Sequence, residues 1–265
     1  MPTESSLKYI RRGAGLPLLL VQGTAATHLH WGERLMSLLA AEFDVVAYDH
    51  RGTGHSASAC ESFTVADLAD DAARLLDRLG WPRAHVMGVS MGGLVAQELA
   101  LRHPGRVESL LLGCTHTGGA GSPAVTSEVL ASAIVPGDKQ ATLRNVFRVG
   151  VKDPERLRRS AWEEYRDAAQ TLPVDARTTA LQIGAVARHS TADRLHRIDV
   201  PTSVVHGDTD RLVPAESGEK LASAIPGARF TVLSAGHFFW LEQPERTLEL
   251  MTELCSAASR EEVSR

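Results

Sequence analysis

The sequence has little of several features that mark common protein classes. Lysine occurs only four times in 265 residues, and a formal net charge of −4 leaves no basic excess of the kind that binds nucleic acid. No apolar run approaches the ~18 residues that a membrane helix requires. The first residues also lack the basic-then-apolar order of a signal peptide. We therefore expect a cytoplasmic protein that binds neither nucleic acid nor a membrane.

Cysteine is scarce as well. The chain contains Cys60, Cys114 and Cys255, which are odd in number and far apart. This usage fits a reducing compartment and not a disulfide framework. No cysteine stands at a metal-site spacing, and His28 and His30 have no third ligand of the expected type nearby. We therefore expect no metal and no cofactor.

Short apolar runs alternate with longer helical patterns along much of the chain, which is typical of a parallel sheet with crossover helices. The runs mostly lack apolar–polar alternation, as in strands that are covered on both faces. With 265 residues, 43% of them hydrophobic, the chain is long enough for one large α/β domain. The predicted strands are Pro17–Val21, Phe43–Tyr48, Ala84–Val89, Val107–Leu112, Thr202–His206 and Ala228–Leu233.

Helical patterns fill the gaps between these runs. The clearest begins at Thr64, which forms a capping-box variant with Asp67 and precedes an apolar stripe at helical spacing. The last begins next to Pro244, a residue that suits the first turn of a helix. The predicted helices are Thr64–Leu79, Met91–Arg102 and Gln243–Ala257.

Residues 120–198 interrupt the alternation, because they carry helical patterns and no strong strand pattern. We predict a core domain of residues 1–119 and 199–265 and a helical cap of residues 120–198, entered through a glycine-rich linker at Gly118–Pro123. Aromatic side chains of the cap and one of the core could line an apolar cavity or simply pack together. The candidate substrate-binding residues are Phe147, Trp162, Tyr165 and Phe238.

The segment Gly88-Val-Ser90-Met-Gly92 matches the pattern G-x-S-x-G. It lies between a predicted strand and a predicted helix, which is the context in which this pattern forms a nucleophile elbow. We expect a strained backbone at Ser90, with the two glycines giving the strand and helix room to approach. The helix N-terminus would favour the negative charge that develops during acyl transfer. The pattern therefore predicts Ser90 as a nucleophile.

Acyl transfer also needs N–H donors that point at the oxygen of the tetrahedral intermediate. One donor should be the backbone N–H of Met91, directly after the nucleophile. The second should come from the loop after the first predicted strand, which reads Gln22-Gly23-Thr24. We expect the Thr24 N–H to be this donor, with Gly23 permitting the close approach of the backbone.

A serine hydroxyl is a weak nucleophile until a histidine takes its proton, and that histidine needs a carboxylate to orient it. Of the 11 histidines, only His237 stands in a strand-end loop after a suitable carboxylate, while His116 is a weaker candidate to face the site. Asp208 and Asp210 both follow the fifth predicted strand, and their spacing leaves both open as the acid. The other aspartate should brace the turn through backbone N–H groups.

Together these motifs resemble the α/β-hydrolase superfamily, in the branch with a helical cap that includes enol-lactonases, small-ester esterases and C–C bond hydrolases. Asp49–Ser56 also fits the family pattern D-x-R-G-x-G-x-S, which shapes a loop near the site. The resemblance implies a mostly parallel, doubly wound sheet and selects Asp210 as the acid. Gln22 departs from the histidine that is common there, which would alter hydrogen bonding in the loop or the polarity of the cavity.

We therefore predict a hydrolase that cleaves a carboxylic ester or lactone of a small, largely apolar substrate through Ser90, Asp210, His237 and an acyl-enzyme. Two alternatives stay open: a hydrolase of C–C bonds next to a ketone, and a non-hydrolytic ligand-binding protein on the same fold. Turnover of a generic p-nitrophenyl ester separates the enzymes from the binding protein. The oligomeric state is not predicted.

Overall fold

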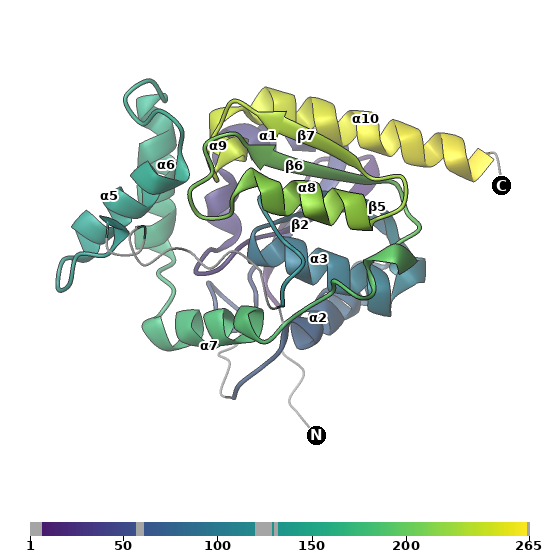
Figure 1. The fold of residues 1–265 in the computed structure, drawn as a ribbon, viewed down its shortest axis with the longest axis horizontal. Helices are drawn as coiled ribbons and strands as arrows, with labels where there is room; N and C mark the ends of the chain where they lie inside the picture. The colour runs from purple at the N-terminus through teal and green to yellow at the C-terminus, as the bar shows by residue number, and fades with distance from the viewer. Residues whose placement is uncertain (1–6, 57–60, 120–128, 130–131, 264–265) are drawn as a thin grey trace.

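A computed structural model describes residues 7–56, 61–119, 129 and 132–263. Cys60 and the part of the predicted linker after residue 119 lie outside these residues. The centre of the fold is a seven-stranded sheet with the order β1-β3-β2-β4-β5-β6-β7 (Figure 1). All neighbouring strands are parallel except β1, which is antiparallel to β3. The strands are β1 (Tyr9–Arg12), β2 (Leu16–Val21), β3 (Phe43–Tyr48), β4 (Ala84–Val89), β5 (Val107–Gly113), β6 (Thr202–Gly207) and β7 (Arg229–Leu233).

The six predicted strands are all present, with their bounds within one residue of the prediction. Every residue of β3, β4 and β6 is buried, which explains why these runs show no alternation of apolar and polar residues. The seventh strand, β1, was not predicted because its sequence YIRR has no apolar run. It forms the edge of the sheet, where the Arg11 guanidinium pairs with the Asp44 carboxylate of β3 at 2.6 Å.

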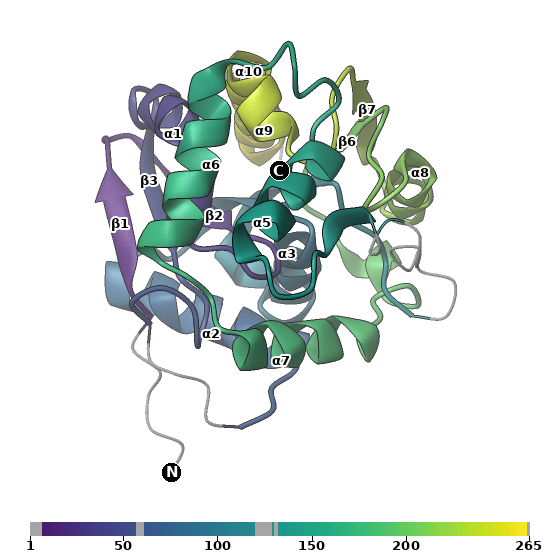
Figure 2. The same cartoon turned by 90° about the vertical axis from the view of Figure 1, so that its left-hand side faces the viewer.

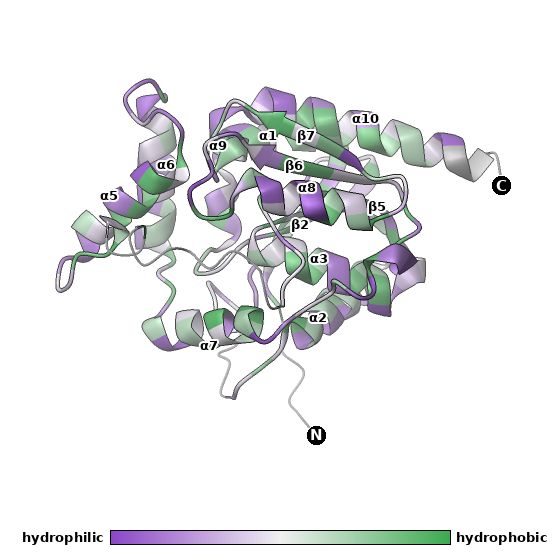
Figure 3. Ribbon diagram, in the orientation of Figure 1, coloured by the Kyte–Doolittle hydropathy of each residue, from purple (hydrophilic) through white to green (hydrophobic). Residues whose placement is uncertain are grey.

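Helices cover both faces of the sheet, so the doubly wound arrangement is confirmed. Helices α1 and α10 lie on one face and α2, α3 and α8 on the other (Figure 1). Each helix carries hydrophobic and hydrophilic residues (Figure 3), and two hydrophobic clusters fill the space between helices and sheet. These helices are α1 (Glu33–Ala40), α2 (Val65–Leu79), α3 (Met91–Arg102), α8 (Ala215–Ala224), α9 (Phe239–Glu242) and α10 (Pro244–Val263), with short 3-10 turns at η1 (His28–Trp31) and η2 (Pro104–Arg106).

Local sequence fixes the ends of α2 as predicted. The Asp67 N–H donates to the Thr64 hydroxyl at 3.1 Å, and the Thr64 N–H donates to the Asp67 carboxylate at 2.8 Å. The helix ends at Gly80, which adopts φ 70° in the left-handed region that glycine tolerates. At the other end of the chain, Pro244 is the first residue of α10, but the helix continues beyond the predicted end at residue 257.

The chain between β5 and β6 forms a helical insertion, and none of its described residues belongs to a strand of the sheet. Helices α5 and α6 stand at one end of the molecule, and Figure 2 shows them in front of the sheet. The two ends of the insertion meet, because Thr191 N–H donates to Thr117 O at 2.8 Å and Gly118 forms a β-bridge with Ser190. The elements of the insertion are α5 (Lys139–Gly150), α6 (Arg159–Thr171), α7 (Ala176–Ala187) and η3 (Leu195–Arg197).

The insertion does not stand wholly apart from the core. Ala185 on α7 is buried in the hydrophobic cluster that lies between the sheet and helices α2 and α3, with Leu181 and Val186 packed against it. The prediction of an inserted helical segment is thus confirmed, while the cap boundaries at residues 120 and 198 stay a prediction. Within the described ranges, every helix is too short or too polar to span a lipid bilayer.

Candidate active site

Ser90 occupies the sharp turn between β4 and α3. Its backbone angles are φ 55° and ψ −123°, in a region that a residue with a side chain rarely adopts. A Cβ on Gly92 would lie 2.1 Å from Val21 O, and a Cβ on Gly88 would lie 2.3 Å from Gly92 O. The strand and the helix therefore approach as closely as the motif predicts, and only glycine fits at these two positions.

Hydrogen bonds hold this strained turn in place. The Ser90 N–H donates to Gly113 O at 2.9 Å, and Ser90 O accepts bonds from the Thr115 hydroxyl at 2.8 Å and Gly93 N–H at 3.0 Å. Ser90 itself is half-buried, at the N-terminus of a helix whose next residue, Met91, is buried. The backbone around Ser90 is thus fixed from the neighbouring strand β5, while its side chain stays partly accessible.

The loop that follows β2 lies against this serine. A Cβ on Gly23 would lie 3.1 Å from Ser90 Cβ and 3.5 Å from Ser90 Oγ, so a larger residue would press on Ser90 Cβ. The Gly23 N–H donates to the side-chain oxygen of Gln22 at 2.9 Å. Thr24, the next residue, is half-buried, and its N–H donates to no acceptor within the described part of the chain. A free N–H at this place suits an incoming oxygen atom.

The segment Asp49–Ser56 supports the same loop, as the resemblance implied. His50 Nε2 lies 3.0 Å from Gln22 O, so its N–H holds the backbone of the loop. The fully buried Asp49 carboxylate accepts the His28 N–H at 2.9 Å and the His55 N–H at 3.1 Å. Burial alone raises the pKa of Asp49, but the His28 imidazole, with Nδ1 2.9 Å from Oδ1, and these N–H groups hold this pKa below its usual value. The segment therefore braces the loop that follows β2.

His237, in the loop after β7, is 4% exposed and pairs with Asp210, in the loop after β6. His237 Nδ1 lies 2.8 Å from Asp210 Oδ2. Asp210 Oδ1 accepts the N–H groups of Leu212 and Val213, both at 2.9 Å. Burial alone raises the pKa of Asp210, but the imidazole and these N–H groups outweigh it and hold this pKa below its usual value. The carboxylate is therefore ionised and fixed in position against the ring.

Asp208 has a different partner. Its Oδ2 lies 2.5 Å from the Lys152 ammonium, which also donates to the Ser234 hydroxyl at 2.8 Å. The expectation that the second aspartate braces the turn through backbone N–H groups was wrong, because Asp210 accepts those N–H groups with its own second oxygen. Asp208 instead joins the loop after β6 to the loop after α5.

The register of the sheet explains why these loops share one edge. Val89 of β4 pairs with Gly113 of β5, and Gly113 pairs with Val205 of β6. Gly207 at the end of β6 then pairs with Leu233 at the end of β7. Parallel strands in this register end side by side, so the loops that carry Ser90, Asp210 and His237 leave the sheet together.

Asp210 also belongs to a second buried group, which it forms with Cys114 and His206. The side-chain atoms of these three residues that could bind a metal lie within 4.8 Å of one another. Burial, with Asp210 nearby, raises the pKa of the Cys114 thiol, and burial lowers the pKa of His206 to about 4. The Cys114 thiol and the His206 imidazole are therefore both neutral. A metal ion there would compete with His237 for the Asp210 carboxylate.

The four candidate substrate-binding residues lie together. The Phe147 ring centroid lies 5.2 Å from those of both Trp162 and Tyr165, in tilted contacts, and the Tyr165 centroid lies 5.2 Å from that of Phe238. Phe238 in turn lies 5.7 Å from the His237 ring. Phe147 and Phe238 are buried, so much of this cluster packs the insertion onto the core next to the histidine.

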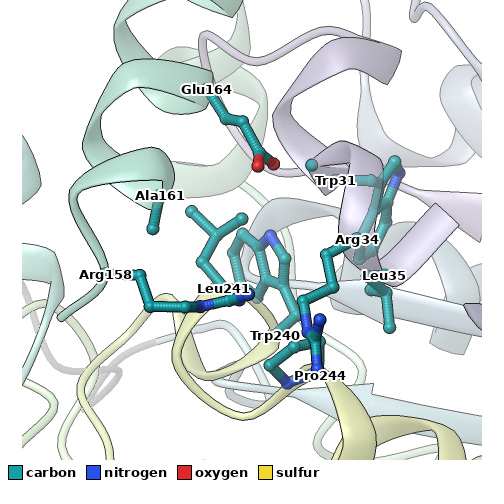
Figure 4. Close-up of a pocket in the computed structure, with 10 residues that line it drawn as sticks. Trp31, Arg34, Leu35, Arg158, Ala161, Glu164, Trp240, Leu241 and Pro244 are labelled. Atoms are coloured by element: carbon teal, nitrogen blue, oxygen red, sulfur yellow. The ribbon is translucent and has the colours of Figure 1, made fainter. Parts of the chain in front are cut away.

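A small pocket lies elsewhere, where the insertion meets the core (Figure 4). It is lined by Trp31, Arg34, Glu164 and Trp240, among others, and has a volume of about 10 Å³, which is room for about one water. None of the predicted catalytic residues lines it. Glu164 accepts the Glu33 N–H at 2.9 Å and so caps α1 from the insertion, which makes this pocket a packing contact.

Two further residues support the site and were not predicted. Glu242, half-buried in the short helix α9, accepts the Gly236 N–H at 2.6 Å and the Lys152 N–H at 2.9 Å, so it fixes the backbone just before His237. Gln182 on α7 accepts the Ala25 N–H at 2.8 Å.

His116 was a candidate to face the site, but its Nδ1 accepts the Gly118 N–H at 2.9 Å within its own turn.

Comparison with known proteins identifies the family of this chain. The family described as alpha/beta hydrolase fold matches residues 17–244. A protein of Azorhizobium caulinodans that is named for carbamate hydrolysis (RutD) is 30% identical, over 95% of this chain and 96% of that protein. A 3-oxoadipate enol-lactonase of Acinetobacter baylyi is 27% identical, over 91% and 90% of the two chains. The thermophilic esterase of Thermogutta terrifontis superposes with a TM-score of 0.78 at 28% identity, over 95% and 93% of the two chains. The chain therefore belongs to the α/β-hydrolase family.

Proposed function

We propose that this hydrolase cleaves a carboxylic ester or lactone of a small, largely apolar substrate, with Ser90, His237 and Asp210 as its catalytic triad. The observation that carries the proposal is the 2.8 Å bond between His237 Nδ1 and Asp210 Oδ2. Such a bond leaves Nε2 of the ring free to accept a proton. The strained, half-buried Ser90 supports its role as the nucleophile.

In the first half of the reaction, Ser90 Oγ attacks the carbonyl carbon while His237 Nε2 takes the hydroxyl proton. The carbonyl electron pair moves to oxygen, and the N–H groups of Thr24 and Met91 stabilise the oxyanion. The intermediate then expels the alkoxide, which takes the proton back from His237 and leaves an acyl-enzyme on Ser90. The Asp210 carboxylate stabilises the imidazolium throughout.

In the second half, His237 takes a proton from water as the water attacks the acyl carbon. The second tetrahedral intermediate expels Ser90 Oγ, which regains its proton from His237, and the carboxylic acid leaves. With a lactone, the alcohol stays tethered to the acyl group through both halves, and a single hydroxy acid leaves. No metal or cofactor has a part in this sequence.

We also propose that residues 120–198 form the cap and that substrate preference depends on it. The aromatic cluster of Phe147, Trp162, Tyr165 and Phe238 supports this, because it joins the insertion to the residue next to His237. The apolar character of the cluster favours a substrate with an apolar acyl or alcohol part.

The test is a panel of p-nitrophenyl esters of increasing acyl length together with simple lactones. We expect turnover of short esters by the wild-type protein and a loss of about 10³-fold or more in Ser90→Ala. A folded wild-type protein that turns over none of these compounds would contradict the proposal.

A further inference from the structure

Two buried glutamine side chains beside the loop after β2 accept a hydrogen bond with the amide oxygen but donate none with the amide nitrogen. Gln22 is 2% exposed, and Gln182 on α7 is fully buried. In both side chains, the amide nitrogen Nε2 has no hydrogen-bond partner among the residues described by the structure. Buried polar groups in folded proteins are nearly always paired, so two unpaired donors beside one loop point to an acceptor that binds there.

The orientation of both amides is fixed by the loop itself. The Gly23 N–H donates to Gln22 Oε1 at 2.9 Å, and the Ala25 N–H donates to Gln182 Oε1 at 2.8 Å. A backbone N–H has only a proton to offer, so the oxygen of each amide must face it. If either amide were flipped, its NH₂ group would face the backbone N–H, and two donors would meet. The NH₂ group of each side chain therefore points away from the backbone N–H that its oxygen accepts.

The location of these donors relates them to the chemistry. The two amides are fastened to Gly23 and Ala25, the residues on either side of Thr24. Gly23 lies against Ser90, since a Cβ there would be 3.5 Å from Ser90 Oγ. Ala25 has φ 57°, so the loop is turned sharply at the point that Gln182 holds. The unpaired donors therefore belong to the immediate support of the proposed oxyanion hole.

The chemistry of the donors limits what they bind. Both are uncharged amide groups, and the hydrogen-bond partners of both side chains are backbone N–H groups and not arginine or lysine. An ionised carboxylate buried against either amide would have no balancing charge from these partners, which is costly. An ether or ketone oxygen accepts such bonds and adds no charge.

We propose that Gln22 and Gln182 form a subsite for a second, uncharged oxygen acceptor in the acyl part of the substrate. This inference rests on the proposed function, in which Thr24 holds the oxygen of the scissile carbonyl. It narrows the substrate class to esters or lactones whose acyl group carries an ether or ketone oxygen near that carbonyl.

A matched pair of substrates tests the subsite. p-Nitrophenyl methoxyacetate and p-nitrophenyl butyrate have the same shape and differ by an oxygen in place of one methylene. The measured quantity is the ratio of their kcat/KM values in each protein, because intrinsic reactivity cancels when ratios are compared. We expect the ratio to fall about three- to tenfold in Gln182→Glu and in Gln22→Glu, which keep the acceptor oxygen and lose the NH₂ donor. Gln170→Glu, at an exposed position on α6, is the control and should leave the ratio unchanged.

A second readout does not depend on hydrolysis. Methyl methoxyacetate and methyl butyrate are titrated into ¹⁵N-labelled Ser90→Ala protein, and the side-chain NH₂ signals of Gln22, Gln182 and Gln170 are followed by NMR. We expect the first two signals to move with the methoxy compound and much less with the butyrate, while the Gln170 signal stays still. Equal shifts with both compounds, or an unchanged kinetic ratio in both variants, would overturn the subsite even where the esters are hydrolysed. If the NMR shifts are specific to the methoxy compound and the wild-type protein hydrolyses none of the esters, the subsite is supported and the proposed function is refuted.

Discussion

Lys152 and Asp208 form an ion pair between the helical insertion and the loop after β6, with 2.5 Å between Nζ and Oδ2. Two residues further along, Asp210 pairs with His237. The two aspartates therefore have separate partners, although their sequence positions are nearly equivalent. This difference gives the first prediction.

We expect Asp208→Asn to retain turnover within about twofold and to lose about 0–1 kcal/mol of stability, because the pair with Lys152 is partly exposed. Lys152→Met removes the same pair from the other side and is the matched control. The measurements are kcat and urea unfolding for both variants. A large loss of kcat in Asp208→Asn alone would mean that Asp208 acts in the reaction.

Asp210→Asn should lower kcat by about 10²–10⁴-fold, since an amide cannot stabilise the imidazolium of His237. Its melting temperature should change little, because the Asn oxygen still accepts the N–H groups of Leu212 and Val213. Asp210→Ala loses these bonds as well and should unfold at a lower temperature. Steady-state kinetics and thermal unfolding of the pair separate the two roles, and near-normal turnover in Asp210→Asn would refute the role of the acid.

Gly23→Ala should lower kcat about 10- to 100-fold, because the added Cβ would press on Ser90 and displace the oxyanion loop. Gly105→Ala is the control, since a Cβ at that position meets no atom within 4 Å. Both variants should fold, as judged by circular dichroism. Equal activity of the two variants would show that the close approach of Gly23 to Ser90 has no role in turnover.

Stability should fall as the pH drops from about 6.5 towards 4. Burial lowers the pKa of His206 to about 4, so between these values the unfolded chain binds a proton that the folded chain does not. The free energy of unfolding therefore decreases by up to about 1.4 kcal/mol per pH unit for each such histidine. The other histidines whose pKa burial lowers to about 4 are His30, His85 and His116.

Urea unfolding at pH 7 and pH 5 measures this effect. His206→Asn should be less stable than the wild type at pH 7 and should lose less stability on going to pH 5. If the loss between the two pH values is the same in both proteins, His206 is not the buried neutral base that its surroundings indicate.

The features that could be predicted from sequence depend on neighbours in the chain. The turn at Ser90 and the N-terminal capping box of α2 at Thr64 are set by residues within a few positions. The apolar runs identify six of the seven strands. β1 was missed because its pairing with β3, and not its own composition, makes it a strand.

Contacts between distant residues could not be read in this way. Spacing alone did not separate Asp208 from Asp210, because the choice depends on where Lys152 and His237 lie in space. Gln182 reaches Ala25 across 157 residues of sequence, and no local pattern marks that contact. The packing of Phe147 against Tyr165 and Phe238 likewise becomes visible only once the insertion is folded onto the core.

The central claim is that Ser90 carries the acyl group, and trapping that intermediate tests it most directly. The protein is mixed with p-nitrophenyl butyrate, quenched in acid within milliseconds, digested and examined by mass spectrometry. The account predicts a burst of p-nitrophenol and a butyryl group on the peptide that contains Ser90, with neither seen in Ser90→Ala. A butyryl group on another residue, or a burst that persists in Ser90→Ala, would contradict it.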